Sequence, residues 1–578
     1  LLPLGLRASG IVMVSIPLSL AIGVTLLNAV GYSINQLSIV GFVIALGLLV
    51  DDSIVVVENI ARFLREGHSR AEAAIAGTQQ IFVAVLGTTA TLVFAFLPVM
   101  MLPGTAGKFI RSMPSAVVLT ILASLVVSLT VVPFLASVFL REEEGEHGNV
   151  FLRALNRGID VTYGRWLHRA LAWPRRTLAV ATLLFLGALA LIPRIGFSLF
   201  PKAGTPQYLV TVHAPDGASL AVTDSAVRVA ERAVLARPET RAVYANVGRG
   251  NPKIYYNINS QSERTTYGEL FVLVDAYDAA RTPAMLDELR RGFDAYPDAR
   301  IEVQEFENGP PIEAPIEFRV TGADLDTLRA IADRLETLIA SEPGTRDVVN
   351  PLRVSRTDLA LRLDRAKAGL LGVPTAEIDR AVRFGLAGLP AGRFRDVDGE
   401  EYAVTLRLPG EARKQADALD RLHVASVTGA QVPLRQLAAF DFERSAPMIQ
   451  HYDGQRAVTV EAQVRTGYNT DRVTRALLAR LDTFPVPAGY RIEAAGEIAS
   501  RQESFGGLGT AILVATFGIL AILVLEFRTF RGMLIVSSVI PLGVIGGLVA
   551  LWLTGYTLSF TAVIGFVALI GIEIKNSI

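Results

Sequence analysis

Long apolar segments occupy both ends of this chain, and a region of ordinary amphipathic patterning separates them. Residues 10–193 and 506–578 contain the apolar segments, whereas residues 196–504 have the pattern of a soluble α+β protein. A helix that crosses a bilayer needs about 20 mostly apolar residues. We therefore predict membrane spans near 10–31, 36–60, 79–101, 114–140, 175–195, 506–527, 533–554 and 557–578.

The middle region alternates strand and helix periodicities. The first set of predicted elements comprises strands 207–214, 268–276 and 300–306 with helices 219–237 and 282–296. The second set follows Gly309-Pro310-Pro311 and comprises strands 315–321, 345–351 and 358–363, helices 324–341 and 375–387, and later helix 470–484 and strand 489–495. This alternation predicts two α+β sandwiches. Residues 390–465 are strand-rich, contain an Asp398-Gly399 hairpin turn, and are predicted to form an inserted module.

An internal repeat relates the two apolar ends of the chain. Residues 7–54 align without gaps to residues 531–578, and 16 of the 48 positions are identical. Arg, Pro and Gly residues stand in register, which apolar composition alone does not produce. Four predicted spans separate the paired segments, so both copies run in the same direction across the membrane. The repeat predicts two halves related by an axis along the membrane normal.

Charged residues lie inside two of the predicted spans. Asp51 and Asp52 occupy the middle of one span, and the repeat places Lys575 at the position of Asp51 and Asn576 at that of Asp52. Each intramembrane charge costs about 2.5–3.5 kcal/mol on insertion scales, so we expect the lysine to face the aspartates. A boundary position and a static ion pair are the structural alternatives to a proton relay. Glu573 lies about 200° around its helix from Lys575 and is expected to line a different interface.

The distribution of arginines predicts the orientation of the spans. Arginines cluster in alternate loops, after residues 60, 140 and 527 and before residue 10, while the other short loops have few charges. Under the positive-inside rule, the arginine-rich loops are cytoplasmic. Residues 196–504 then lie on the opposite side, which is the periplasm in a double-membraned bacterium. We expect the chain to be a fragment, because it begins without Met and ends inside an apolar run.

Composition restricts the chemistry of the chain. It contains no cysteine, which excludes thiolate metal sites and cysteine nucleophiles, and its net charge is zero. No phosphate-binding loop of the form G-x-x-x-x-G-K-[ST] occurs, which argues against an ATP-driven pump. The six histidines show no metal-ligand spacing, and residues 196–504 contain no nucleophile–base constellation. We therefore expect a transporter without a cofactor rather than an enzyme.

Two motifs resemble a known transporter superfamily. The segment Gly47-Leu48-Leu49-Val50-Asp51-Asp52-Ser53-Ile54-Val55-Val56-Val57-Glu58-Asn59 resembles the fourth span of the resistance-nodulation-division superfamily, hydrophobe/amphiphile efflux branch. Gly571-Ile572-Glu573-Ile574-Lys575-Asn576 resembles its tenth span, although Glu573 departs from the best-known drug pumps. The resemblance implies that Asp51, Asp52 and Lys575 form the proton relay, with Asn576 and Glu573 as polar support. Tyr255, Tyr256 and Phe271 are candidates for the substrate pocket, with packing inside a sandwich as the alternative.

The resemblance also implies a domain plan and partners. The expected function is proton/substrate antiport of amphiphilic compounds across the bacterial inner membrane, by a homotrimer that joins a periplasmic adaptor and an outer-membrane channel. Heavy-metal efflux and a proton-driven protein-export subunit remain as alternatives. The implied domains are spans three to six at 1–147, a cytoplasmic interfacial helix at 148–174, span seven at 175–195, porter subdomains at 196–389, a docking subdomain at 390–465, a return to the porter at 466–505 and truncated spans eight to ten at 506–578.

Overall fold

The chain combines a helical region with a sheet-rich region. The structure is a computed structural model that describes residues 5–140, 157–198, 200, 202–410 and 419–578. Within those residues, eight helical segments are long and apolar enough to cross a membrane, and each overlaps one predicted span. They are Arg7–Ala29, Gln36–Arg65, Arg70–Met100, Gly107–Phe139, Pro174–Ile195, Gly509–Phe527, Phe530–Thr554 and Phe560–Ser577.

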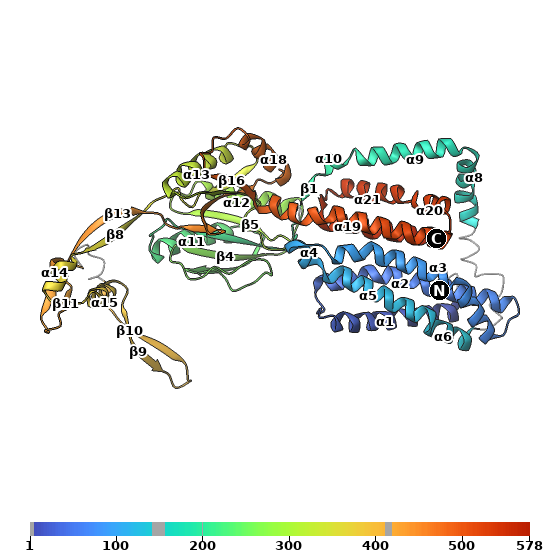
Figure 1. The fold of residues 1–578 in the computed structure, drawn as a ribbon, viewed down its shortest axis with the longest axis horizontal. Helices are drawn as coiled ribbons and strands as arrows, with labels where there is room; N and C mark the ends of the chain where they lie inside the picture. The colour runs from blue at the N-terminus through green and yellow to red at the C-terminus, as the bar shows by residue number, and fades with distance from the viewer. Residues whose placement is uncertain (1–4, 141–156, 199, 201, 411–418) are drawn as a thin grey trace. The chain divides into compact units, whose positions relative to one another are not determined.

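The apolar helices form two neighbouring groups that share α3 (Figure 1). On one side α3 contacts α2 and α5, and on the other it contacts α19 and α22. The first group is α1 (Gly5–Ala29), α2 (Gln36–Arg65), α3 (Arg70–Met100), α4 (Gly104–Ile110), α5 (Ser112–Leu129) and α6 (Val131–Phe139). The second is α9 (Pro174–Leu189), α10 (Ile192–Ile195), α19 (Gly496–Phe527), α20 (Phe530–Ser537), α21 (Ile540–Thr554) and α22 (Phe560–Ser577).

The first sheet of the sheet-rich region is antiparallel, with strand order β3-β4-β2-β5. Its strands are β2 (Gln207–His213), β3 (Thr240–Val247), β4 (Tyr267–Val274) and β5 (Arg300–Glu305). Helices α11 (Leu220–Leu235) and α12 (Arg281–Asp294) pack on the face that carries Tyr208, Val210 and Val212. Strand β3 was not predicted from the sequence. It is an edge strand, and its half-exposed side chains lack a strong apolar alternation.

The second sheet has strand order β14-β15-β6-β16, with β7 also paired to β15. Its strands are β6 (Ile316–Thr321), β7 (Thr345–Val349), β14 (Gln450–Tyr452), β15 (Gln455–Val464) and β16 (Arg491–Ala495), and its helices are α13 (Leu325–Ala340) and α18 (Thr470–Leu481). Helix α19 begins at the residue after β16. Gly496 makes that junction with φ of +63°, and a Cβ there would lie 2.8 Å from the Ala314 carbonyl oxygen.

Residues Pro351–Gln450 form a separate compact unit. Its elements are β8 (Arg356–Leu363), α14 (Arg365–Leu370), α15 (Thr375–Leu386), β9 (Leu389–Arg395), β10 (Glu401–Leu406), β11 (His423–Ala425), β12 (Gln431–Pro433), α17 (Leu434–Leu437) and β13 (Ala438–Ser445). Strands β9 and β10 form the predicted hairpin, and Gly399 adopts a φ of +84° in its turn. Ile378, Leu434 and Leu437 lie in its own apolar core.

Two sequence-based boundaries need correction or qualification. The inserted module was predicted at 390–465, but the compact unit begins at Pro351, and residues 455–464 pair with β6 in the second sheet. The apolar alternation of Val458, Val460 and Ala462 suits a buried sheet and gives no boundary signal. The interfacial helix predicted at 148–174 is seen as a π-helical turn, η1 (Asp160–Gly164), and α8 (Arg165–Ala172). Residues 148–156 lie outside the described residues.

A short strand bridge connects the helical and sheet-rich regions. Strands β1 (Phe197–Ser198) and β17 (Leu558–Ser559) pair in parallel, and the Leu558 amide donates a hydrogen bond of 2.9 Å to the Gly196 carbonyl. The Asn469 side chain, which also caps α18, donates a hydrogen bond of 3.0 Å to the Phe197 carbonyl. The start of α22 is thus tied by hydrogen bonds to the second sheet subdomain.

Like charges oppose each other on the second sheet. Glu461 of β15 pairs in register with Glu317 of β6. Directly opposed like charges destabilise a sheet unless one is neutralised. Burial, and then the nearby Glu317, Glu313 and Glu302 carboxylates, raise the pKa of Glu461 to about 7. Burial also raises the pKa of Glu317. This strand pair therefore favours at least one protonated carboxyl.

We predict that Gly268→Ala destabilises the first sheet. A methyl group there would overlap the Val227 side chain of α11, and overpacking of a filled core costs about 1–3 kcal/mol. Gly292→Ala in α12 is the matched control, because a methyl group there meets no atom within 4 Å. Thermal unfolding in detergent should show a lower Tm for the first variant only. Equal Tm values for the two variants would contradict the packing described here.

We also predict that this region loses stability as pH rises from about 4.5 to about 7. Glu461 has a raised pKa in the folded chain, so the native state binds more protons than the unfolded state in that window. The free energy of unfolding therefore falls across the window. Glu461→Gln should flatten this pH dependence of Tm relative to the wild type. An unchanged slope in the variant would show that Glu461 is not the titrating group.

Candidate functional site

The structure brings the three predicted intramembrane charges together. The Lys575 Nζ lies 3.0 Å from an Asp52 carboxylate oxygen and 3.8 Å from an Asp51 carboxylate oxygen. It also donates a hydrogen bond of 3.0 Å to the Leu48 carbonyl oxygen of α2. Asp52 and Lys575 are 4% and 8% exposed. A buried ion pair therefore joins α2 near its middle to α22 near its end.

Similar local features position the two helices. Helix α2 begins at Gln36, and its N-cap Asn35 accepts a hydrogen bond of 2.9 Å from the Ser38 amide. Helix α22 begins at Phe560, which aligns with Gln36, and its N-cap Ser559 accepts one from the Ala562 amide. Both caps satisfy amides that would otherwise lack a partner in an apolar environment. The charges consequently lie at a comparable distance from a capped helix start.

Close packing and hydroxyl groups surround the ion pair. A methyl group at Gly41 would lie 3.0 Å from the Ala116 Cβ, so the absence of a side chain lets α2 approach α5 closely. The Ser124 hydroxyl of α5 donates to the Leu49 carbonyl at 3.3 Å. The Ser53 and Ser15 hydroxyls hydrogen-bond to each other at 2.8 Å. These contacts fix the segment of α2 that carries the aspartates.

The two aspartates differ in exposure. The Asp51 side chain is 44% exposed, whereas that of Asp52 is 4% exposed. Lys575 therefore makes its closer contact with the buried acid, and Asp51 remains accessible from one side. The Asn576 side chain, predicted as polar support, is exposed.

Glu573 lies at a different helix interface, as its angular position predicted. Its Cγ would be 3.0 Å from a methyl group added at Gly543 of α21. The carboxylate therefore packs on the α21 backbone rather than beside Lys575. In the described chain it belongs to the α21–α22 contact.

The three aromatic residues proposed for the substrate pocket belong to one chain of ring contacts. The rings of Tyr255 and Tyr256 lie 4.8 Å apart, and Tyr255 and Phe306 lie 4.7 Å apart. Phe271 of β4 contacts Phe306 with a ring separation of 6.2 Å. The series of ring contacts also includes residues that were not predicted from the sequence. It continues from Tyr256 to Phe109 of α4 and then to Phe200 and Phe560. It runs from the first sheet to the start of α22.

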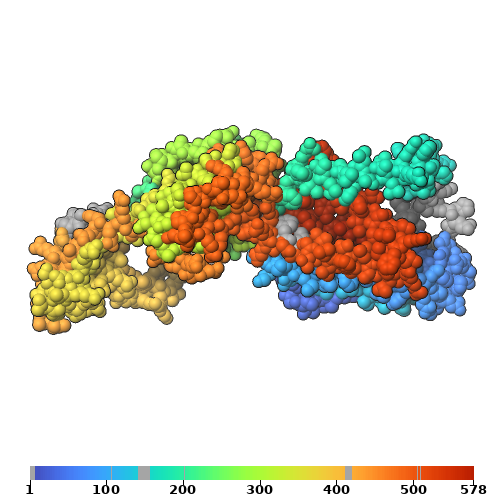
Figure 2. Space-filling model, turned by 45° about the horizontal axis from the view of Figure 1, so that its top comes forward, coloured from blue at the N-terminus to red at the C-terminus, as the bar shows by residue number. Residues whose placement is uncertain are grey.

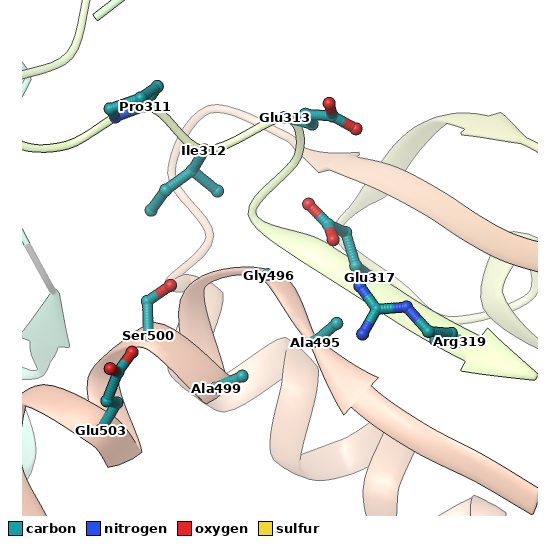
Figure 3. Close-up of a pocket in the computed structure, with 10 residues that line it drawn as sticks. All are labelled: Pro311, Ile312, Glu313, Glu317, Arg319, Ala495, Gly496, Ala499, Ser500 and Glu503. Atoms are coloured by element: carbon teal, nitrogen blue, oxygen red, sulfur yellow. The ribbon is translucent and has the colours of Figure 1, made fainter. Parts of the chain in front are cut away.

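An acidic cavity lies where the second sheet meets the start of α19 (Figure 3). Its volume is about 290 Å³. Glu317 and Arg319 reach it from β6, Ser500 and Glu503 from α19, and Ile312 and Glu313 from the preceding loop. The lining combines three carboxylates and one guanidinium with small apolar side chains, which suits a positively charged amphiphilic molecule.

Sequence reasoning missed three features of these sites. The Leu48 carbonyl is a backbone group and has no side-chain signature. Phe109, Phe200 and Phe306 are scattered along the chain and meet only after folding. Glu526 is the one charged residue in the apolar run 506–527, and no partner for it can be identified in the repeat.

Comparisons with known proteins identify the family of this chain. The AcrB/AcrD/AcrF family matches residues 4–578. The chain is 26% identical over 589 aligned positions to the swarming motility protein SwrC of Bacillus subtilis (strain 168), which covers 99% of this chain and 54% of SwrC. The chain thus spans about half the length of this curated relative. Because the family match covers nearly every residue, the chain belongs to the AcrB/AcrD/AcrF family of resistance-nodulation-division transporters.

Proposed function

We propose that this chain is the coupling part of a proton-driven exporter of amphiphilic or hydrophobic compounds. The protein exchanges protons for substrate across the bacterial inner membrane. Asp51, Asp52 and Lys575 carry the coupling. The observation that carries the proposal is the buried Asp52–Lys575 contact at 3.0 Å, which joins two helices from opposite ends of the chain.

The energetics of a buried ion pair explain how it responds to a proton. Breaking such a pair by removing one charge costs about 3–5 kcal/mol, because the other charge stays buried and uncompensated. Protonation of Asp52 removes its charge in the same way. Lys575 then keeps only Asp51 and the Leu48 carbonyl as polar partners. The loss of its closest charge partner favours a shift of α22 relative to α2. The half-exposed Asp51 provides the accessible acid through which protons reach the pair.

One proton moved by voltage alone does not supply the whole switch. A charge crossing 100 mV releases about 2.3 kcal/mol. Moving a two-state equilibrium from 1:99 to 99:1 requires about 5.5 kcal/mol. A pH gradient, a second proton or substrate binding therefore contributes the remainder. The strand bridge between β1 and β17 carries the shift of α22 to the sheet subdomains.

The substrate contacts proposed here are aromatic and acidic. Tyr255, Tyr256 and Phe271 offer ring faces for apolar groups, and Glu313, Glu317 and Glu503 offer negative charge in the cavity beside α19. An amphiphilic cation has an apolar part that can contact the aromatic rings and a positive charge that can pair with the carboxylates.

We further propose the assembly and orientation that the family resemblance implies. Residues 196–504 lie in the periplasm, and the intact protein is a homotrimer. Residues Pro351–Gln450 dock against other subunits, a periplasmic adaptor and an outer-membrane channel. The support is the compact fold of this unit and the arginine-rich loops at the other ends of the spans.

We predict that Asp51→Asn, Asp52→Asn and Lys575→Met each abolish substrate-coupled proton uptake by the full-length protein in proteoliposomes. Asp298→Asn, an exposed aspartate of the sheet region, is the matched control and should couple normally. Wild-type coupling in both aspartate variants would contradict the assignment of Asp51 and Asp52 to the proton relay.

The double variant Asp52→Asn/Lys575→Met separates coupling from folding. Removing both partners leaves only the half-exposed Asp51 without its lysine, whereas Lys575→Met also leaves Asp52 buried and unpaired, so the Tm of the double variant should exceed that of Lys575→Met. Transport should remain absent in the double variant. Recovery of transport together with stability would make the ion pair purely structural.

We also predict that Glu317→Gln combined with Glu313→Gln weakens transport of cationic amphiphiles. The expected change is a rise in apparent KM of roughly tenfold for a cationic substrate, with little change for a neutral one, because the lost interaction is electrostatic. Glu231→Gln in α11, outside the cavity lining, is the control. An equal effect on cationic and neutral substrates would contradict charge recognition in the cavity.

A further inference from the structure

One further carboxylate in the apolar helices has no part in the ion pair. Glu526 lies within the Gly509–Phe527 span, in the last turn of α19. A methyl group added at Gly87 of α3 would lie 2.8 Å from the Glu526 Cδ. Its Oε2 is buried and has no hydrogen-bond partner. The acid therefore packs on the bare backbone of α3.

The contacts along α3 place Glu526 close in depth to Lys575. Gly571 of α22 lies against Leu92 and Ala95 of α3. Helices α3 and α22 run in opposite directions, so four residues further along α22 corresponds to about Thr88–Thr91 at 1.5 Å per residue. Glu526 contacts the same helix at Gly87. The two charged groups thus differ in depth by about one helical turn of α3.

The face of α3 between these two contacts carries hydroxyl groups. At 100° per residue, Thr91 lies about 40° and Thr88 about 100° around the helix from Gly87, toward the face that contacts Gly571. The Thr91 hydroxyl donates to the Gly87 carbonyl at 2.8 Å, and the Thr88 hydroxyl donates to the Val85 carbonyl at 3.0 Å. Each hydroxyl oxygen keeps acceptor capacity for a proton-bearing group or a water molecule.

The described residues around Glu526 give its carboxyl no ion-pair partner. The C-terminal end of a helix disfavours negative charge. Between Glu72 and Met100, α3 has no charged side chain. The nearest charges in sequence are Arg528, which ends α19 with a φ of +54°, and Arg531 in α20. Glu573 and Lys575 are the ionisable groups of α22. On the face shown in Figure 2, the orange-red helix α19 is uncovered along much of its length.

We propose that Glu526 is a second proton-binding carboxylate of this transporter, at the contact between α19 and α3 rather than at the Asp52–Lys575 pair. In each cycle it takes up one proton to become the neutral acid and returns that proton to water at the α19–α20 end. This proposal rests on the proposed proton-coupled function and adds a residue to it. The unpaired Oε2 and the contact with Gly87 carry it.

The first test measures coupling in full-length protein reconstituted in liposomes. Glu526→Gln keeps the size and polarity of the side chain but binds no proton, so substrate-coupled proton uptake should fall by at least about tenfold. Glu526→Asp, which retains the acid, should restore part of that loss. Glu66→Gln, at the exposed end of α2, is the control and should behave as wild type.

The second test detects the proton itself. Dicyclohexylcarbodiimide reacts with protonated carboxyls in apolar surroundings, and peptide mass spectrometry identifies the labelled residue. We expect Glu526 to be labelled near neutral pH and the labelling to decrease when substrate export is driven by a proton gradient. Absence of labelling together with wild-type uptake in Glu526→Gln would overturn the proposal. Absence of coupled uptake in the wild type would instead overturn the proposed function, so the two failures are distinguishable.

Discussion

The buried contact between Asp52 and Lys575 constrains the arrangement of the whole helical region. An isolated charge in an apolar interior is too costly to persist, so α2 and α22 must approach each other at this point although more than 500 residues separate the partners. Other features follow from this pairing. The glycine contacts that bring α2 to α5 and α22 to α3 set the distance at which the charges meet. The hydroxyls of Ser53 and Ser124 then hold the same stretch of α2.

Much of the secondary structure is evident from the sequence because its signals are local. The apolar segments are long enough to exclude other interpretations. Strand β2 is a short buried run of strand-forming residues, and β6 alternates between the two faces of its sheet. Edge strand β3 was missed because one of its faces is exposed and its pattern carries little information. The boundaries of the Pro351–Gln450 unit were misplaced because strand pairing, rather than local pattern, assigns β15 to the second sheet.

The charged site was accessible to sequence reasoning for a different reason. The repeat places Lys575 at the position equivalent to Asp51, and charge complementarity predicts that the two side chains face each other. The repeat does not predict which of the two aspartates is more buried, because their exposure depends on how α1 and α5 pack against α2. The acidic cavity and the aromatic chain were beyond sequence reasoning. Glu317 and Glu503 are far apart in the chain, and Phe109 and Tyr256 stack only when α4 meets the loop after β3.

The strand bridge between β1 and β17 has a consequence for how such proteins diverge. Its connection consists of main-chain hydrogen bonds, such as the one from the Leu558 amide to the Gly196 carbonyl. Backbone amides and carbonyls are present whatever side chains the sequence encodes, with proline as the exception. The strand bridge therefore tolerates amino-acid substitutions at nearly every one of its positions. Relatives that share little sequence identity with this chain can therefore retain the strand bridge while the surfaces on either side of it differ.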